Sequence, residues 1–202
     1  MSCFSSKLNL FKVESRIVND DRSALICCKP HDRSVQEGKG IIIYYSLTYR
    51  EWSEDTQKEL RSLTRESVSG DELFLRKLVD ATRLHDKLWS HISNESEEHT
   101  DHSVYVTEFT GERAKPYGAS ITDLVLASEG GYTSTFSGMY WIWHEPAFRS
   151  MDQREGSVFT LELAQRLLDH YTVLGGKTYE FIYSVLDPQL KKVHLFVKEV
   201  DL

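Results

Sequence analysis

Aromatic residues are most concentrated over residues 130–148, where they alternate with smaller or polar residues. Two alternating runs, residues 132–136 and 139–144, flank Ser137-Gly138, a small dipeptide suited to a two-residue hairpin turn. Side chains alternate between the two faces of a strand, so this turn would gather the rings on one face. We expect that face to carry Tyr132, Phe136, Trp141 and Trp143. Such a face must be covered, either by the protein's own core or by a partner.

The composition is that of one folded domain. The chain has 202 residues, of which 40% are hydrophobic and 27% are charged, enough to build one sizeable core. We therefore predict a single domain over residues 1–202, with residues 1–7 as a loose N-terminal tail. Acidic residues outnumber basic ones by 31 to 24, and no dense cluster of Lys and Arg side chains occurs. This acidic balance disfavours binding to nucleic acid.

The N-terminal sequence and the cysteines favour an intracellular protein. The first residues lack the basic segment and apolar stretch of a secretory signal, and the apolar runs of the chain are too short to span a bilayer. The three cysteines are Cys3, Cys27 and Cys28, an odd set whose two neighbours would point to opposite faces of a strand. We therefore expect reduced thiols and a cytoplasmic location.

Helix signals fall in three places. Ser53 can cap a helix that reaches about Arg65. Ser69 and Glu72 form a capping-box pattern for a longer helix over about 71–92. A third helix is expected from about Thr160 to the Gly175-Gly176 pair. Residues 121–127 fit either a short helix or a strand.

Strand signals occupy much of the remaining chain. Apolar or alternating runs predict strands over residues 8–13, 24–28, 41–48 and 103–109. The chain ends in a predicted hairpin with turn chemistry at Asp187-Pro188. Its first strand should carry Tyr179, Phe181, Tyr183 and Val185 on one face, and its return strand Val193, Leu195 and Val197.

These elements predict the fold class α+β. We expect a mostly antiparallel sheet of about six to eight strands, including two hairpins, with three main helices packed on it. No internal repeat, low-complexity tract or Pro/Gly linker divides the sequence.

Two groups of residues have the chemistry of metal or catalytic sites but not the spacing. Residues 97–102 contain Glu97, Glu98, His99, Asp101 and His102, whereas a catalytic zinc helix places its histidines at i and i+4. Here the histidines are three positions apart, in a polar segment that has no sign of regular structure and that we interpret as a linker. His85 lies on the apolar stripe of the long predicted helix, where a packed core histidine is the commoner case. We therefore predict no metal and no cofactor.

A candidate ligand site lies at the end of the aromatic run. His144 and Glu145 form a plausible acid–base pair or ligand clamp at a strand end. The loop over residues 110–120 adds Arg113, Lys115 and Tyr117, since loops displayed by rigid strands often carry binding residues. The alternative is an exposed strand end beside a solvated loop, because consecutive strand residues face opposite sides.

The function classes follow from what is present and what is missing. The sequence lacks a nucleophile elbow, a P-loop, a dinucleotide fingerprint and an EF-hand loop, so we assign no catalytic residue. The leading hypothesis is a non-catalytic interaction or assembly protein that uses the aromatic hairpin to contact a protein partner or itself. The alternative is a small intracellular enzyme or ligand-binding protein with a pocket near His144, Glu145 and the loop 110–120. A viral matrix-type structural protein is a weaker alternative.

Overall fold

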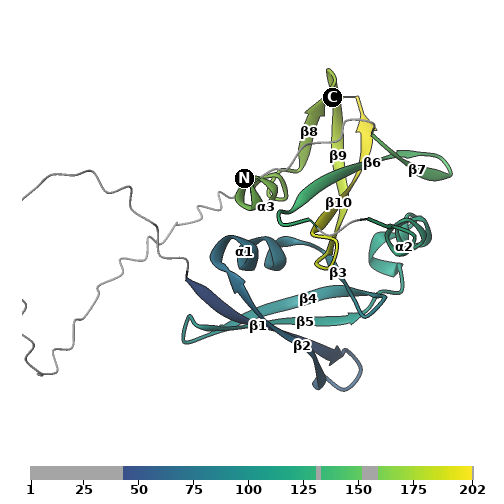
Figure 1. Ribbon diagram of the computed structural model, residues 1–202. Helices are drawn as coiled ribbons and strands as arrows, with labels where there is room; N and C mark the ends of the chain where they lie inside the picture. The colour runs from purple at the N-terminus through teal and green to yellow at the C-terminus, as the bar shows by residue number, and fades with distance from the viewer. Residues whose placement is uncertain (1–42, 131–132, 152–158, 202) are drawn as a thin grey trace, which may run out of the picture. The chain divides into compact units, whose positions relative to one another are not determined.

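The computed structural model describes residues 43–130, 133–151 and 159–201, within a compact unit that spans residues 40–202 (Figure 1). The described residues form ten strands, three α-helices and one 3-10 helix. All ten strands belong to one sheet that contains both parallel and antiparallel pairs. The α+β class is thus confirmed, but the sheet is mixed and has more strands than we predicted. The expected tail and the strands at 8–13 and 24–28 lie outside the described residues.

The elements alternate in two similar series along the chain. The first series is β1 (Tyr44–Ser53), β2 (Lys58–Ser69), α1 (Gly70–Leu78), β3 (Ala81–Leu84), β4 (Lys87–Glu97) and β5 (Asp101–Glu108). A connection with η1 (Glu112–Ala114) and α2 (Gly118–Leu126) follows. The second series is β6 (Ser137–His144), β7 (Ala147–Ser150), α3 (Thr160–Arg166), β8 (Tyr171–Leu174), β9 (Lys177–Asp187) and β10 (Lys192–Val200).

The two series have the same strand order and the same pairing. The first is ordered β2-β1-β5-β4-β3 and the second β7-β6-β10-β9-β8. In each, the first strand runs parallel to the last, and the remaining pairs are antiparallel. A bulge recurs 90 positions apart, at Ile92 in β4 and at Ile182 in β9. We call residues 44–108 the N-terminal repeat and residues 137–200 the C-terminal repeat.

The prediction of no internal repeat is therefore wrong. The clearest sequence trace is in the helices, where Glu72, Leu73, Arg76 and Leu78 recur as Glu162, Leu163, Arg166 and Leu168. Most other positions differ, because the outer faces of the two repeats are built for different surroundings, as described below. The duplication is therefore hard to detect from the amino-acid sequence, but the strand order and the pairing register show it clearly.

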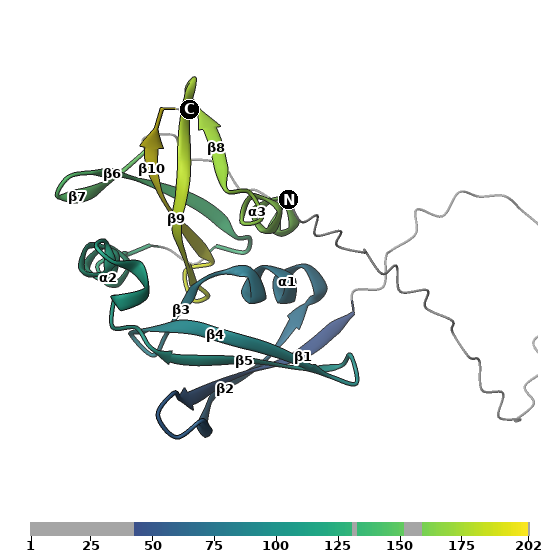
Figure 2. The same cartoon turned by 180° about the vertical axis from the view of Figure 1, so that it is seen from behind.

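Helices α1 and α3 lie beside each other and connect the cores of the two repeats (Figures 1 and 2). Leu73 of α1 packs with buried residues of β1 and β5 in the N-terminal repeat. Leu75 of the same helix packs with Leu163 of α3 and with buried residues of β6 and β10 in the C-terminal repeat. Helix α1 therefore contributes Leu73 to one core and Leu75 to the other, while Phe74 is 41% exposed.

A short parallel junction joins the repeats. Ala81 and Thr82 of β3 pair with Val185 and Leu186 of β9, and both β3 residues are fully buried. The Asp80 carboxylate accepts hydrogen bonds from the backbone nitrogen of Ser184 at 2.8 Å and from its hydroxyl at 2.7 Å. Burial raises the pKa of Asp80 although these hydrogen bonds oppose the shift.

The predicted aromatic hairpin is wrong in its turn. Residues 137 and 138 lie inside β6, where Ser137 pairs with Lys192 and Gly138 with Val193 of the parallel strand β10. The chain instead reverses after His144, which pairs with Ala147 of β7. A parallel partner distant in sequence fixed this register, and no local turn signal reports it.

The predicted helices are wrong in extent. The segment expected to be helical up to Arg65 is strand β2, and α1 ends at Leu78, before the β3–β4 hairpin, whose turn contains His85. The cap is confirmed, because the backbone nitrogen of Glu72 donates to the Ser69 hydroxyl at 3.3 Å. The apolar residues of 81–89 fit a helical spacing but pair as strands. Among the described residues, none of the helices is both long and apolar enough to cross a membrane.

The C-terminal elements confirm the hairpin and correct its details. Helix α3 ends at Arg166, so Gly175-Gly176 does not end a helix; with φ values of +57° and +79° the pair forms the β8–β9 turn. The predicted common face of β9 is divided by the bulge: Tyr179 packs on the α1 and α3 side, whereas Tyr183 packs on the opposite side. The ambiguous segment 121–127 is part of helix α2.

Candidate functional site

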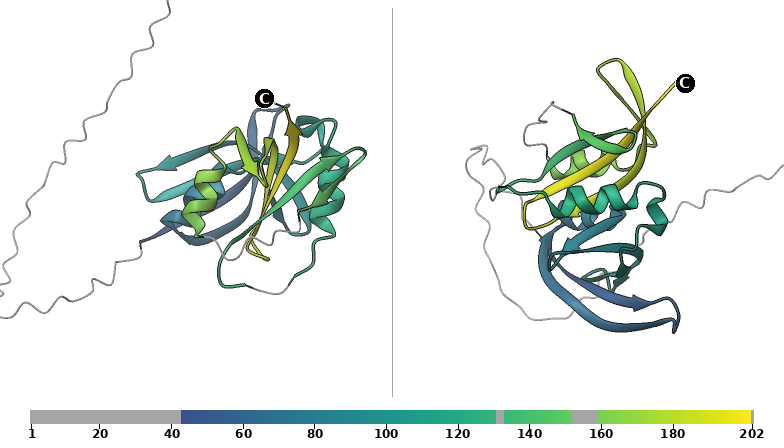
Figure 3. Two further views of the ribbon diagram at one scale, coloured as in Figure 1. Left: turned by 90° about the horizontal axis from the view of Figure 1, so that it is seen from above. Right: turned by 90° about the vertical axis from the view of Figure 1, so that its right-hand side faces the viewer.

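The site is the sheet face of the N-terminal repeat that is turned away from α1 and α3. We call the corresponding face of each repeat its outer face. In the C-terminal repeat the outer face is covered by η1 and α2 (Figure 3), with Ile121 and Val125 buried against Val185 and Phe196. Among the described residues of the N-terminal repeat, α2 packs only against Ala81 of β3 and Leu88 at the start of β4. Within residues 43–130, 133–151 and 159–201, no helix covers the outer face of β2, β1, β5 and the end of β4.

Equivalent positions explain this difference. Arg50 and Ser103 of the N-terminal repeat correspond to Trp141 and His194, because β1 pairs with β5 in the same register as β6 with β10. By the same comparison Glu95 corresponds to Val185, and Tyr105 corresponds to Phe196. The outer face that holds α2 is thus apolar, whereas the open one is polar. An uncovered sheet face is stable in water only when its outward positions are polar.

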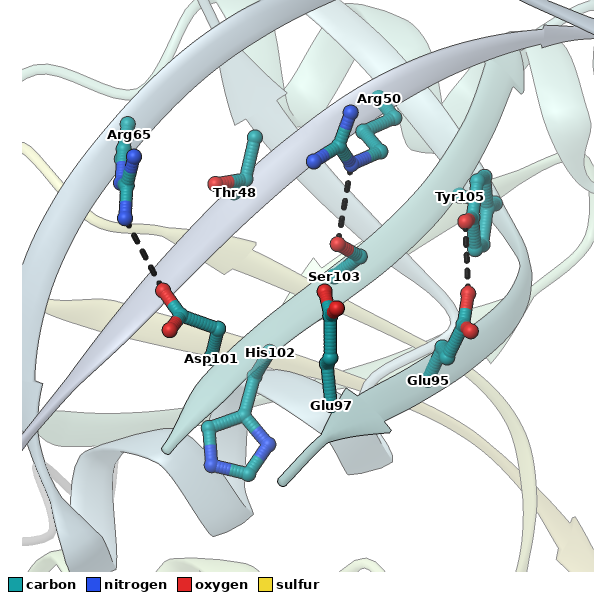
Figure 4. A pocket seen from close by; sticks show the side chains of 9 residues that line it. All are labelled: Thr48, Arg50, Arg65, Glu95, Glu97, Asp101, His102, Ser103 and Tyr105. Atoms are coloured by element: carbon teal, nitrogen blue, oxygen red, sulfur yellow. Dashed lines mark hydrogen bonds and ion pairs between the residues drawn. The ribbon is translucent and has the colours of Figure 1, made fainter. Parts of the chain in front are cut away.

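The open face is hollowed into a groove of about 440 Å³ across β2, β1, β5 and β4 (Figure 4). We call it the polar groove. It is lined by Thr48, Arg50, Arg65, Glu95, Glu97, Asp101, His102, Ser103 and Tyr105.

Most charged side chains of the polar groove are held in place across neighbouring strands. Arg50 donates from Nε to the Ser103 hydroxyl at 2.9 Å and from Nη1 to the Glu59 carboxylate at 2.8 Å. Arg65 donates to Asp101 at 2.9 Å. The Tyr105 hydroxyl donates to Glu95 at 2.7 Å, and this hydrogen bond raises the pKa of Tyr105. Cross-strand pairs of this kind reduce the number of side-chain rotamers that binding would have to fix.

Glu97 differs from its neighbours. Figure 4 shows its carboxylate in the middle of the groove, pointing toward Ser103. Among the described residues its side chain has no hydrogen-bond or ion-pair partner, and Glu95, Glu97 and Asp101 together outnumber the two arginines that line the groove. The groove therefore holds an uncompensated carboxylate at its centre. Glu95 adds a second negative charge, because its partner is the neutral Tyr105 hydroxyl and Arg50 is paired with Glu59.

His102 contributes little to the chemistry of the groove. Its imidazole points away from the other lining side chains (Figure 4), and Nδ1 lies 2.9 Å from the Ser96 hydroxyl and 3.1 Å from Lys77 Nζ. Burial and the Lys77 charge lower the pKa of His102, so its ring is neutral at pH 7. The Ser103 hydroxyl accepts from Arg50 and has no histidine base, and no group of metal-ligating side chains occurs in the described part of the chain. The arrangement is suited to binding charged groups.

The residues predicted on the aromatic face are divided between the two faces of β6. Phe136 is 2% exposed and packs on the α1 and α3 side of the sheet. Trp141 and Trp143 lie on the outer face, where Trp141 donates from Nε1 to His194 Nδ1 at 3.0 Å. The Trp143 ring stands edge-on to Tyr117 with centroids 4.8 Å apart. Tyr132 lies outside the described residues.

The candidate ligand residues are partly brought together. Tyr117 contacts the β6–β7 hairpin through Trp143, and His144 and Glu145 are exposed at its turn. Arg113 is directed elsewhere, to the backbone oxygen of His91 at 3.1 Å and to the Glu54 carboxylate, and Lys115 pairs with Glu112. None of these five residues lines the polar groove.

Sequence reasoning missed most of the groove. The segment interpreted as a polar linker is the end of β4, the turn at Glu98-His99 and the start of β5. Glu97 and Asp101 were considered only as metal ligands, although they face each other across this hairpin. The sequence did contain a signal, because residues two positions apart share a strand face and are polar in both segments. These residues are Glu95 and Glu97 on one strand, and Asp101, Ser103 and Tyr105 on the next.

The close approach of Gly118 to Gly111 gives a test of how α2 is held. A Cβ on Gly118 would overlap the Gly111 backbone. We expect Gly118→Ala to lower the free energy of unfolding by about 1–3 kcal/mol, measured by urea denaturation, because an overpacked contact must move. The control is Gly130→Ala, where the nearest atom to the new Cβ is Lys192 Nζ at 3.7 Å. Equal effects of the two substitutions would contradict the tight η1–α2 contact.

Comparisons with protein-family models, curated proteins and solved structures find no match to this chain. The function is therefore inferred from the groove and its relation to the second repeat.

Proposed function

We propose that this protein is a non-catalytic interaction protein whose polar groove receives a charged segment of a protein partner. The observation that carries the proposal is the relation between the two outer faces. In the C-terminal repeat this face receives α2 of the same chain, and in the N-terminal repeat the equivalent face is an open groove lined by charged side chains.

The chemistry of the groove supports a partner segment that carries both polar and positively charged groups. Arg50 and Arg65 are already paired with carboxylates. A partner would therefore meet their ordered hydrogen-bonding groups and not free cations. Glu97 supplies the charge that a partner's Lys or Arg side chain would neutralise. Electrostatic complementarity of this kind contributes mainly to specificity and association rate.

In this proposal the aromatic residues support the fold instead of contacting the partner. Trp141 and Trp143 pack with Tyr117, His194 and Phe148 of the same chain. The proposed contact surface is therefore the polar groove and not the aromatic run, and the class of function is the one expected from the sequence.

Site-specific photo-crosslinking tests the proposal. A photoreactive amino acid at Ser103, inside the groove, should capture a protein from an extract of the cells that make this chain. The same group at Asp123, on the exposed side of α2, should not capture that protein. The captured protein is then purified and titrated against variants. We expect Glu97→Gln to weaken binding at least about tenfold, because it removes the carboxylate that a partner's Lys or Arg side chain would neutralise.

The matched control for Glu97→Gln is Glu98→Gln, at an exposed residue of the β4–β5 turn that is outside the groove-lining set. It should leave affinity within about twofold, because an exposed charge outside the contact contributes little. Equal loss in both variants, or capture that is independent of the crosslinker's position, would contradict the groove as the contact surface.

A further inference from the structure

The free edge of β8 forms a second surface, separate from the polar groove. Within the described residues, β8 pairs only with β9, through residues 171–174 and 177–180. In this two-residue hairpin the outermost hydrogen bond joins the Phe181 nitrogen to the His170 oxygen at 3.0 Å. Backbone groups alternate in direction along an antiparallel pair, so Tyr171 and Val173 turn their N–H and C=O groups away from β9.

The equivalent edge in the N-terminal repeat is used to join strands. Ala81 and Thr82 of β3 occupy the positions equivalent to Tyr171 and Thr172, and they pair with β9. Ala81 is fully buried there, whereas Tyr171 is 48% exposed and Val173 is 68% exposed. The same edge of the same structural unit is thus covered in one repeat and open in the other.

The other two sheet edges carry features that prevent pairing. Strand β2 contains Lys58, Glu59, Arg61, Arg65 and Glu66, and its pairing with β1 is interrupted by two register shifts. Strand β7 contains Arg149 among its four residues. Charged side chains and irregularities are the usual protection of exposed edges. Strand β8 is as short as β7, but its sequence Tyr-Thr-Val-Leu has no charge and no proline.

We infer that β8 pairs with β8 of a second copy of this chain, antiparallel about a two-fold axis. An uncharged strand offers nothing by which a charged partner would be recognised, but it is complementary to itself. A two-fold interface, in which the same patch serves both subunits, is the commonest arrangement of homo-oligomers. The pairing would cover Tyr171 and Val173. Leu168, which lies just before the strand, is also exposed, at 57%.

The test measures mass and hydrogen exchange together under reducing conditions. Sedimentation equilibrium of the full chain should give a concentration-dependent doubling of mass. Amide hydrogens of Tyr171 and Val173 should exchange slowly at high concentration and rapidly on dilution. Val173→Lys should weaken association at least about tenfold by placing like charges across the two-fold axis. It should leave the circular dichroism spectrum unchanged, because Val173 is largely exposed.

The matched control is Leu60→Lys on β2, an equally charged change at a residue that is 58% exposed on another edge. It should leave association unchanged. A monomer at all concentrations, a dimer that persists in Val173→Lys, or equal weakening by both substitutions would each overturn the inference. None of these outcomes bears on the polar groove, which lies on the other repeat.

Discussion

Replacing Arg83 with methionine is expected to lower the free energy of unfolding by about 3–5 kcal/mol, because a buried carboxylate loses its cation. Arg83 Nη1 lies 3.1 Å from Asp187 Oδ2, and the Asp187 side chain is 1% exposed. The same nitrogen donates to the backbone oxygen of Val125 at 3.2 Å. One guanidinium therefore ties β3 of the N-terminal repeat to β9 of the C-terminal repeat and to the end of α2.

Chemical denaturation measures this effect, and two variants serve as references. Arg61→Met removes an arginine whose side chain is 67% exposed, and it should cost no more than about 1 kcal/mol. Arg83→Lys keeps the charge but loses the planar fork, so its cost should fall between the two. If Arg83→Met and Arg61→Met had the same stability, Arg83 would not be the tie between the repeats.

Acidification is expected to destabilise the protein through His194. This side chain is fully buried, and burial, aided by the charges of Lys192 and Arg83, lowers its pKa to about 3. The unfolded chain binds a proton near the ordinary histidine value of about 6.5, whereas the folded chain resists it until about pH 3. The contribution of His194 to stability is therefore full above pH 6.5 and falls by about 1.4 kcal/mol for each pH unit below it, down to about pH 3.

A glutamine at position 194 should flatten this part of the pH profile. The Gln amide oxygen can accept the hydrogen bond that Trp141 now donates to His194 Nδ1, but it does not titrate. We expect the difference in unfolding free energy between pH 7 and pH 5 to shrink by about 2 kcal/mol in His194→Gln. Urea denaturation at the two pH values gives this difference. His99→Gln, at an exposed turn position, should leave it unchanged; equal slopes for wild type and His194→Gln would contradict the assignment.

The two repeats differ in which of their equivalent surfaces are covered. In the C-terminal repeat the outer face is committed to α2, and its Val185 and Phe196 belong to the core. In the N-terminal repeat the equivalent Glu95 and Tyr105 remain at the surface and form part of the polar groove. The free edge of β8 shows the reverse pattern, since its counterpart β3 is the covered one.

Local signals were enough wherever a few neighbouring residues fixed the structure. The Ser69 cap, the strand predicted over residues 103–109 and the C-terminal hairpin follow from capping, alternation and turn residues. The structure contains the cap and the hairpin, and the strand is β5, which runs from Asp101 to Glu108. The class α+β follows from the same signals. These features depend on hydrogen bonds and side-chain spacing within a short stretch of chain.

Only the tertiary structure decided which strands are neighbours and which faces are covered. Residues 71–92 carry a helical spacing of apolar residues, yet β3 and β4 are strands because β9 and β5 supply their hydrogen-bond partners. Ser137-Gly138 has turn chemistry, yet β10 holds it in a strand. The groove likewise stays open because α2 packs on the C-terminal repeat and reaches only β3 and the start of β4 in the N-terminal repeat. Pairing partners that lie far away in sequence outweigh local preference, since burial and ladder hydrogen bonds together exceed the differences in intrinsic propensity.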